Sequence, residues 1–305
     1  MSFEEQERAL FDLLFDRKLR RRFCEKSVVA LSGYRLDDSE RKDFSQIRTD
    51  ALELDAWMRA DLVLSHLCRS FPLGFSIASS LDQGMEMLRD LVDTGMMRTP
   101  PLERTPAFGA RLRERLAAAK FPTAAEQAAA LAVAEAELGM AWTSSTLKRE
   151  VVEHGAPERD KSSLADDWLN KPVALAPYVC ASTIPQSYQQ LKDTLCPGTE
   201  PELWQHLSRT ALPASLRTQA LRNEDPKLLV TRAHVTHASR CEPVVAQVTV
   251  ELSEGFVSLF QHVDGSMSVG QILAHFKHAG APDRLIQSVH LAFQQLLQTG
   301  MLRCQ

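Results

Sequence analysis

The chain has 305 residues, 44% of them hydrophobic and 24% charged, with a formal net charge of −4. That length suits two domains of roughly 150 residues each. The acidic balance disfavours a protein that works through phosphate contacts, so no nucleic acid partner is expected. The longest apolar runs fall short of the ~20 residues of a membrane helix, so we expect no membrane-spanning helix and no membrane partner.

The N-terminus is acidic and has no apolar signal core, so we expect a cytoplasmic protein. Its six cysteines are scattered without a C-x-x-C pair and are expected to be reduced thiols.

Helical periodicity predicts a helical N-terminal domain over residues 1–160. The expected helices cover Phe3–Phe23, the stretch from Asp37 or Ser39 to Trp57, Ala60–Arg69, Leu81–Thr94, Ala110–Ala119 and Ala124–Leu138. The polar stretch Gly155–Asp167 is interpreted as the linker to a second domain.

Two segments of similar sequence, Asp93–Arg98 and Gln298–Arg303, both contain Thr-Gly-Met. Each is expected to close a helix, with Gly95 or Gly300 as a left-handed C-cap. The repeat indicates either a convenient helix stop used twice or a duplicated ending.

Residues 161–305 are predicted to open with an irregular, proline-rich segment and to end in a winged-helix-like unit with its core at about 227–305. Lys227–His237 predicts one strand, or two if it bends, and Val244–Leu252 another. Ser268 and Gln271 form a capping box before a short helix, and a long amphipathic helix follows Pro282. The expected fold class is therefore α+β and predominantly α-helical, with a C-terminal domain of a three-stranded antiparallel sheet and three helices.

Residue patterns for catalysis are missing. His234 and His237 would face opposite sides of a strand, and His275 and His278 have no third ligand at a recognised metal spacing. Nucleophile elbows and phosphate-binding loops are absent from the sequence. We expect a chain that is not catalytic alone and carries no metal or cofactor. An enzyme with a site built from scattered cysteines and histidines is a weaker hypothesis.

A winged-helix-like unit can read DNA with its last helix or take a peptide beside its strand. The expected last helix has a single strong base, Arg284, and Cys241–Gln305 holds three bases and five acids. A DNA-binding transcriptional regulator would lack phosphate neutralisation and is therefore the alternative hypothesis.

The peptide hypothesis uses the strand edge, where unpaired N–H and C=O groups accept an added strand. The expected site combines one face of the Val244–Leu252 strand with the outer face of the last helix. The candidate peptide-binding residues are Val245, Gln247, Thr249, Glu251, Arg284, Gln287, Ser288, Leu291, Gln294 and Gln295.

The stretches Val250–Ile272 and Leu296–Arg303 carry a strand, an apolar–Asp-Gly–x–x–Ser-Val–x–x–Ile pattern and a helix ending in glycine. This arrangement resembles the PqqD-like recognition domain for precursors of ribosomally made, modified peptides. The chain also resembles the partner subunits of multinuclear-iron TIM-barrel enzymes, of the methanobactin type and more closely of the TglI type. The segments that carry this second resemblance are Arg21–Phe23, Ala30-Leu31, Tyr34–Leu36, Arg69–Leu73 and His206–Leu216.

The resemblance implies a division of labour in a heterodimer. The iron would reside in the barrel subunit, which performs an oxygen-dependent reaction on a peptidyl cysteine. In the TglI-type case this reaction excises the β-carbon of a C-terminal cysteine during 3-thiaglutamate biosynthesis. The present chain would bind the ribosomal precursor peptide and the barrel subunit.

Overall fold

A computed structural model describes residues 3–155, 167–198, 202–222, 225–239 and 241–305. It divides the chain into two units, Met1–Ala119 with Cys196–Ala214 and Lys120–Leu195 with Ser215–Gln305. The predicted boundary near residue 160 differs from this division, and residues 156–166 of the expected linker lie outside the described part. No helix of the described residues combines the length and apolar composition that a membrane span requires.

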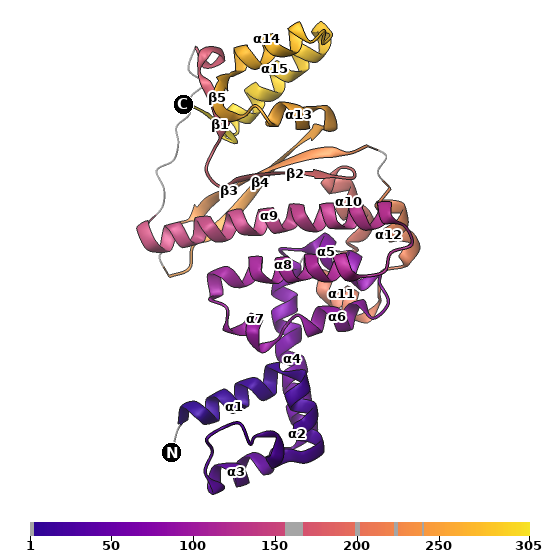
Figure 1. The fold of residues 1–305 in the computed structure, drawn as a ribbon, viewed down its shortest axis with the longest axis vertical. Helices are drawn as coiled ribbons and strands as arrows, with labels where there is room; N and C mark the ends of the chain where they lie inside the picture. Colours follow the sequence, from indigo (N-terminus) through magenta and orange to yellow (C-terminus); the bar gives the residue numbers. More distant parts are fainter. Residues whose placement is uncertain (1–2, 156–166, 199–201, 223–224, 240) are drawn as a thin grey trace. The chain divides into compact units, whose positions relative to one another are not determined.

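The first unit is helical (Figure 1). Its helices are α1 (Phe3–Phe15), α2 (Arg17–Ala30), α3 (Asp38–Ser45), α4 (Thr49–Cys68), α5 (Pro72–Ser79), α6 (Gly84–Asp90), α7 (Thr94–Arg98), α8 (Pro101–Ala118) and α11 (Leu203–Arg209). One part of its core is an aromatic cluster, in which Phe75 stacks on Phe108 and meets Trp204 edge-on. This contact joins α11 to helices that precede it by about 100 residues or more in the sequence.

All five expected helices of this unit have bounds that differ from the observed ones. The expected Ala60–Arg69 helix is the C-terminal part of α4, Leu81–Thr94 is shortened to α6, and Ala110–Ala119 begins earlier, as α8. The predicted helix Phe3–Phe23 is two helices, because the Asp16 carboxylate accepts hydrogen bonds from the Lys18 and Leu19 N–H groups and starts α2. The helix expected from Asp37 or Ser39 to Trp57 ends at Ser45, and α4 then runs through to Cys68. Asp37 is the N-cap, and it forms a capping box with Glu40.

The second unit combines helices with two three-stranded sheets. Its helices are α9 (Ala124–His154), η1 (Trp168–Asn170), α10 (Tyr188–Leu195), α12 (Ala214–Ala220), η2 (Glu254–Phe256), α13 (Val257–Phe260), α14 (Val269–His278) and α15 (Asp283–Gln298). Its strands are β1 (Pro172–Leu175), β2 (Val179–Ile184), β3 (Lys227–His237), β4 (Val244–Ser253), β5 (Asp264–Ser268) and β6 (Leu302–Cys304). The α+β class with mainly helical content is thus confirmed.

The sheets are ordered β5–β1–β6 and β2–β3–β4, and all pairs are antiparallel. The segment expected to be irregular therefore supplies β1 and β2, and the Asp264-Gly265 pair begins β5. Lys227–His237 is one strand, not two. The capping box of Ser268 and Gln271 and the long helix after Pro282 are present as predicted.

The β2–β3–β4 sheet lies between α9 and the C-terminal helices (Figure 1). Leu229 of β3 packs on Met140 of α9, and Ala233 of β3 packs on Leu147 of α9. The alternate residues Leu228 and Val230 face the other way, into a cluster with the C-terminal helices. Successive strand residues point to opposite faces, so one strand serves two layers.

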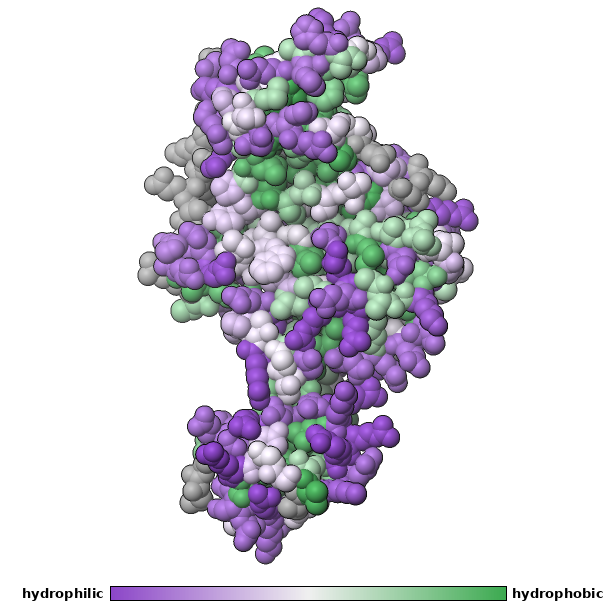
Figure 2. Space-filling model, in the orientation of Figure 1, coloured by the Kyte–Doolittle hydropathy of each residue, from purple (hydrophilic) through white to green (hydrophobic). Residues whose placement is uncertain are grey.

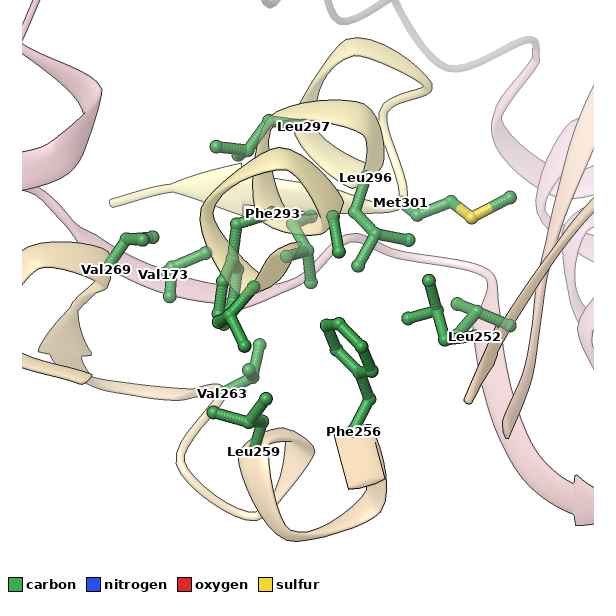
Figure 3. Packing of buried hydrophobic residues seen from close by; sticks show 14 of the residues in the cluster. Val173, Leu252, Phe256, Leu259, Val263, Val269, Phe293, Leu296, Leu297 and Met301 are labelled. Carbon is green, nitrogen blue, oxygen red and sulfur yellow. The ribbon is translucent and has the colours of Figure 1, made fainter. Parts of the chain in front are cut away.

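The C-terminal cluster is the main apolar core of this layer. Leu252 of β4, Phe256 of η2 and Leu296 of α15 converge in it (Figure 3). Phe293 of α15 is 2% exposed. The cluster buries the even-numbered face of β4 at the C-terminal end of the strand, and the opposite face of β4 lies toward α9.

The two Thr-Gly-Met segments have different structures. Gly300 has φ +68° and ends α15, as predicted for a left-handed C-cap. Gly95 lies inside α7, which Asp93 caps by accepting a hydrogen bond from the Met96 N–H at 2.7 Å. The prediction for Gly95 was wrong because an acidic cap starts a new helix there, and the duplicated ending is not found.

We expect Gly300→Ala to lower the free energy of unfolding by about 2–3 kcal/mol, measured by urea denaturation. Alanine is strained at this φ, and its Cβ would collide with the Arg232 guanidinium, which donates to the Thr299 carbonyl at 3.2 Å. Gly280→Ala is the matched control, since Gly280 has φ +83° and open space around it. It should cost only about 1–2 kcal/mol. Equal losses of stability in both variants would show that the collision with the Arg232 guanidinium adds no cost.

Candidate functional site

The free edge of β4 is the strongest candidate for a binding site. β4 is the last strand of its sheet and pairs only with β3 among the described residues. It is ten residues long, and Val244–Ser253 contains neither lysine nor proline. Exposed edges of natural sheets are commonly blunted by such residues, because unpaired N–H and C=O groups attract further strands. The β4 edge lacks these two residue types, although it carries the exposed Glu251 and its pairing with β3 has an irregularity near Val244.

The register shows which backbone groups point outward. In antiparallel strands, the N–H and C=O of one residue point to the same side, and the side alternates along the strand. The Ala233 N–H donates to the Tyr178 carbonyl at 2.9 Å, so the backbone groups of Ala233 point toward β2. The backbone groups of the neighbouring residues Arg232 and His234 therefore point toward β4, where these residues lie opposite Val248 and Ala246.

It follows that the even-numbered residues of β4 complete the ladder to β3. The backbone groups of the alternate residues point away from the sheet, and these residues are Val245, Gln247, Thr249 and Glu251. Within the described part of the chain, no hydrogen bond to these outward groups is observed. The four strand residues of the predicted peptide site are thus the ones whose backbone can accept an added strand.

Three of these side chains contact α9 or the start of α10. The Gln247 amide donates to the Met140 carbonyl and to Ser144 Oγ, both at 2.8 Å. Val245 packs against Leu147 of α9. Glu251 accepts a hydrogen bond from the Tyr188 N–H at 2.8 Å.

The last helix does not share a surface with these side chains, which corrects the predicted site. Its predicted residues lie on its outer face, where Gln294 is half-buried and the others are exposed: Arg284, Gln287, Ser288, Leu291 and Gln295. The buried face of α15, with Val289 and Phe293, packs toward the even-numbered face of β4. The strand and helix sets are therefore on different sides of the sheet, because α9 occupies the side that the sequence left open.

An apolar pocket of about 60 Å³ lies between η2, α14 and α15. Phe256, Phe276 and Leu285 are among its lining residues. The ring of His262 meets Phe276 edge-on beside it. Its lining is almost entirely apolar, so it suits an aliphatic or aromatic side chain and offers no group for catalysis.

Three of the cysteine thiols have pKa values that burial raises. Burial raises the pKa of the Cys180 thiol, which lies against Gly139 of α9. Burial likewise raises the pKa of Cys24 and of Cys304. A raised pKa keeps a thiol protonated at neutral pH, the opposite of an activated nucleophile. Among the described residues, His, Cys, Asp and Glu side chains form no group of three that could hold a metal ion.

Comparisons with protein-family models, with curated proteins and with solved structures give no match to this chain.

Proposed function

We propose that this chain is the peptide-binding, non-catalytic subunit of an iron-dependent peptide-modifying enzyme. In this proposal a ribosomal precursor peptide adds as a further strand to the free edge of β4. The observation that carries the proposal is the set of outward backbone groups at Val245, Gln247, Thr249 and Glu251. Main-chain hydrogen bonds of this kind give affinity to a peptide of any sequence that can extend.

The other parts of the proposal rest on the sequence resemblance. The iron-containing TIM-barrel subunit would form a heterodimer with this chain and carry out the reaction in the cytoplasm. The peptide held on β4 would present its cysteine to that subunit, with β-carbon excision in 3-thiaglutamate biosynthesis as the specific reaction.

We expect Thr249→Pro to weaken binding of the precursor peptide by about tenfold or more, which is about 1.4 kcal/mol. Proline removes the outward N–H of residue 249, and its ring obstructs the incoming strand. The N–H is not used in the β3–β4 ladder, so the fold should persist, as circular dichroism would show. The measurement is titration with a fluorescently labelled candidate precursor peptide.

Thr249→Ala is the matched control, because it shortens the side chain and keeps the N–H. Its affinity should stay within about threefold of the original chain. If the proline and alanine variants bind the precursor as tightly as the original chain, strand addition at β4 is excluded.

A further inference from the structure

The even-numbered face of β4 changes from buried to exposed along the strand. Val250 and Leu252 are 9% and 8% exposed, because the C-terminal cluster covers them. Val244 and Val248 are 50% and 42% exposed. Apolar surface is visible between the C-terminal helices and the β2–β3–β4 sheet (Figure 2). The N-terminal half of β4 therefore presents uncovered apolar side chains on this face.

From Gln247 onward, the odd-numbered face of the same strand is polar. Gln247, Thr249 and Glu251 are exposed residues on it. The Glu251 carboxylate accepts the Tyr188 N–H, and among the described residues no Lys or Arg forms an ion pair with it. β4 thus carries an apolar row of side chains (Val244, Ala246 and Val248) on one face and a polar row (Gln247, Thr249 and Glu251) on the other.

An added strand extends both rows. Its side chains alternate between the same two faces, so every second residue lies beside Val244, Ala246 and Val248. In antiparallel addition these would be the non-hydrogen-bonded pairs, with Cα atoms about 4.5 Å apart and side chains in closest contact. The intervening residues would lie beside Gln247, Thr249 and Glu251.

We propose that the β4 edge selects an extended segment with strictly alternating residues, apolar and β-branched on the Val248 side and polar or basic on the Glu251 side. This inference rests on the proposed function and names the class of peptide that the edge prefers. A shift of the segment by two residues keeps the match, whereas a shift by one places every side chain on the wrong face. The pattern therefore fixes the face on which each side chain lies, while registers that differ by two residues remain equivalent.

The test uses three labelled nine-residue synthetic peptides. The first, the alternating or lysine peptide, alternates valine with threonine and lysine. The second, the block peptide, has the same composition with the valines in one block. The third, the glutamate peptide, replaces the lysines of the first by glutamates. We expect the alternating peptide to bind about tenfold more tightly than the block peptide, and the glutamate peptide to bind several-fold more weakly than the lysine peptide.

Two variants test which face of β4 causes each difference in peptide affinity. Val248→Thr, which is nearly isosteric, should reduce the preference for alternation. Glu251→Gln should remove the preference for lysine over glutamate. Thr249→Pro should weaken binding of every peptide. Equal binding of the three peptides, lost in Thr249→Pro, would overturn this inference and leave the proposed function standing. Failure of these peptides and of the precursor to bind would overturn both.

Discussion

Replacing Arg217 by alanine is expected to lower the free energy of unfolding by about 3–5 kcal/mol. Arg217 Nε lies 2.6 Å from Glu126 Oε1, and the two side chains are 4% and 5% exposed. Thr218 Oγ1 lies 3.3 Å from each oxygen of the same carboxylate, and the guanidinium lies over the Phe121 ring. Without the arginine, a buried carboxylate near the start of α9 would have no cation. Urea denaturation followed by circular dichroism measures the loss.

An exposed pair provides the control. Arg59 and Asp55 are 3.0 Å apart with side chains 53% and 49% exposed, so Arg59→Ala should cost no more than about 1 kcal/mol. The double variant Arg217→Met with Glu126→Gln should recover part of the loss, because it removes both charges. A loss below about 1 kcal/mol for Arg217→Ala would contradict the burial of the pair.

Phe293→Ala is expected to have a comparable effect, about 3–5 kcal/mol. The Phe293 ring lies within the C-terminal cluster, where alanine would leave a cavity that the surrounding side chains fill only in part (Figure 3). The same cluster covers Val250 and Leu252 of β4, so the variant should also loosen β4. Urea denaturation gives the first effect, and faster exchange of the Val250 amide gives the second.

Leu291→Ala is the control on the same helix. Leu291 is 56% exposed, so its truncation should change stability by about 0.5 kcal/mol or less. If the two variants were equally stable, Phe293 would not be the core residue that the structure describes.

Local signals in the sequence predicted parts of the fold well. The capping box before α14 needs only two residues three apart, and both of its hydrogen bonds are present, from Ser268 N to Gln271 Oε1 at 2.8 Å and from Gln271 N to Ser268 Oγ at 3.2 Å. The spacing of Val289, Phe293 and Leu296 likewise identified the buried face of α15. Such features depend on neighbours within one or two helical turns.

Features that depend on distant partners were missed. The helix expected to end at Leu138 continues to His154. Its C-terminal half packs on the β2–β3–β4 sheet, where Met140 and Leu147 meet Leu229 and Ala233 of β3. These contacts join segments about 90 residues apart in the sequence, which a local pattern does not indicate. β2 itself is short and proline-flanked, and its pairing with β3 could not be inferred locally.

The candidate site shows the same division. Alternation along Val244–Leu252 correctly separated the two faces of the strand, and the outward backbone groups belong to the predicted residues. The wall beside them was misassigned to α15, because α9 precedes β4 by about 100 residues and no local pattern indicates that Ser144 meets Gln247. The DNA-binding alternative stays a prediction, with Arg284 as the single Lys or Arg of α15.

Backbone hydrogen–deuterium exchange along β4, resolved by residue with NMR, tests the central claim most directly. In the free chain, the amides of Gln247, Thr249 and Glu251 should exchange roughly tenfold or more faster than those of Val248, Val250 and Leu252. Addition of the precursor peptide should slow exchange at the first three selectively. Slow exchange at Gln247, Thr249 and Glu251 before any peptide is added, or no slowing when the peptide is bound, would contradict a free β4 edge that captures a strand.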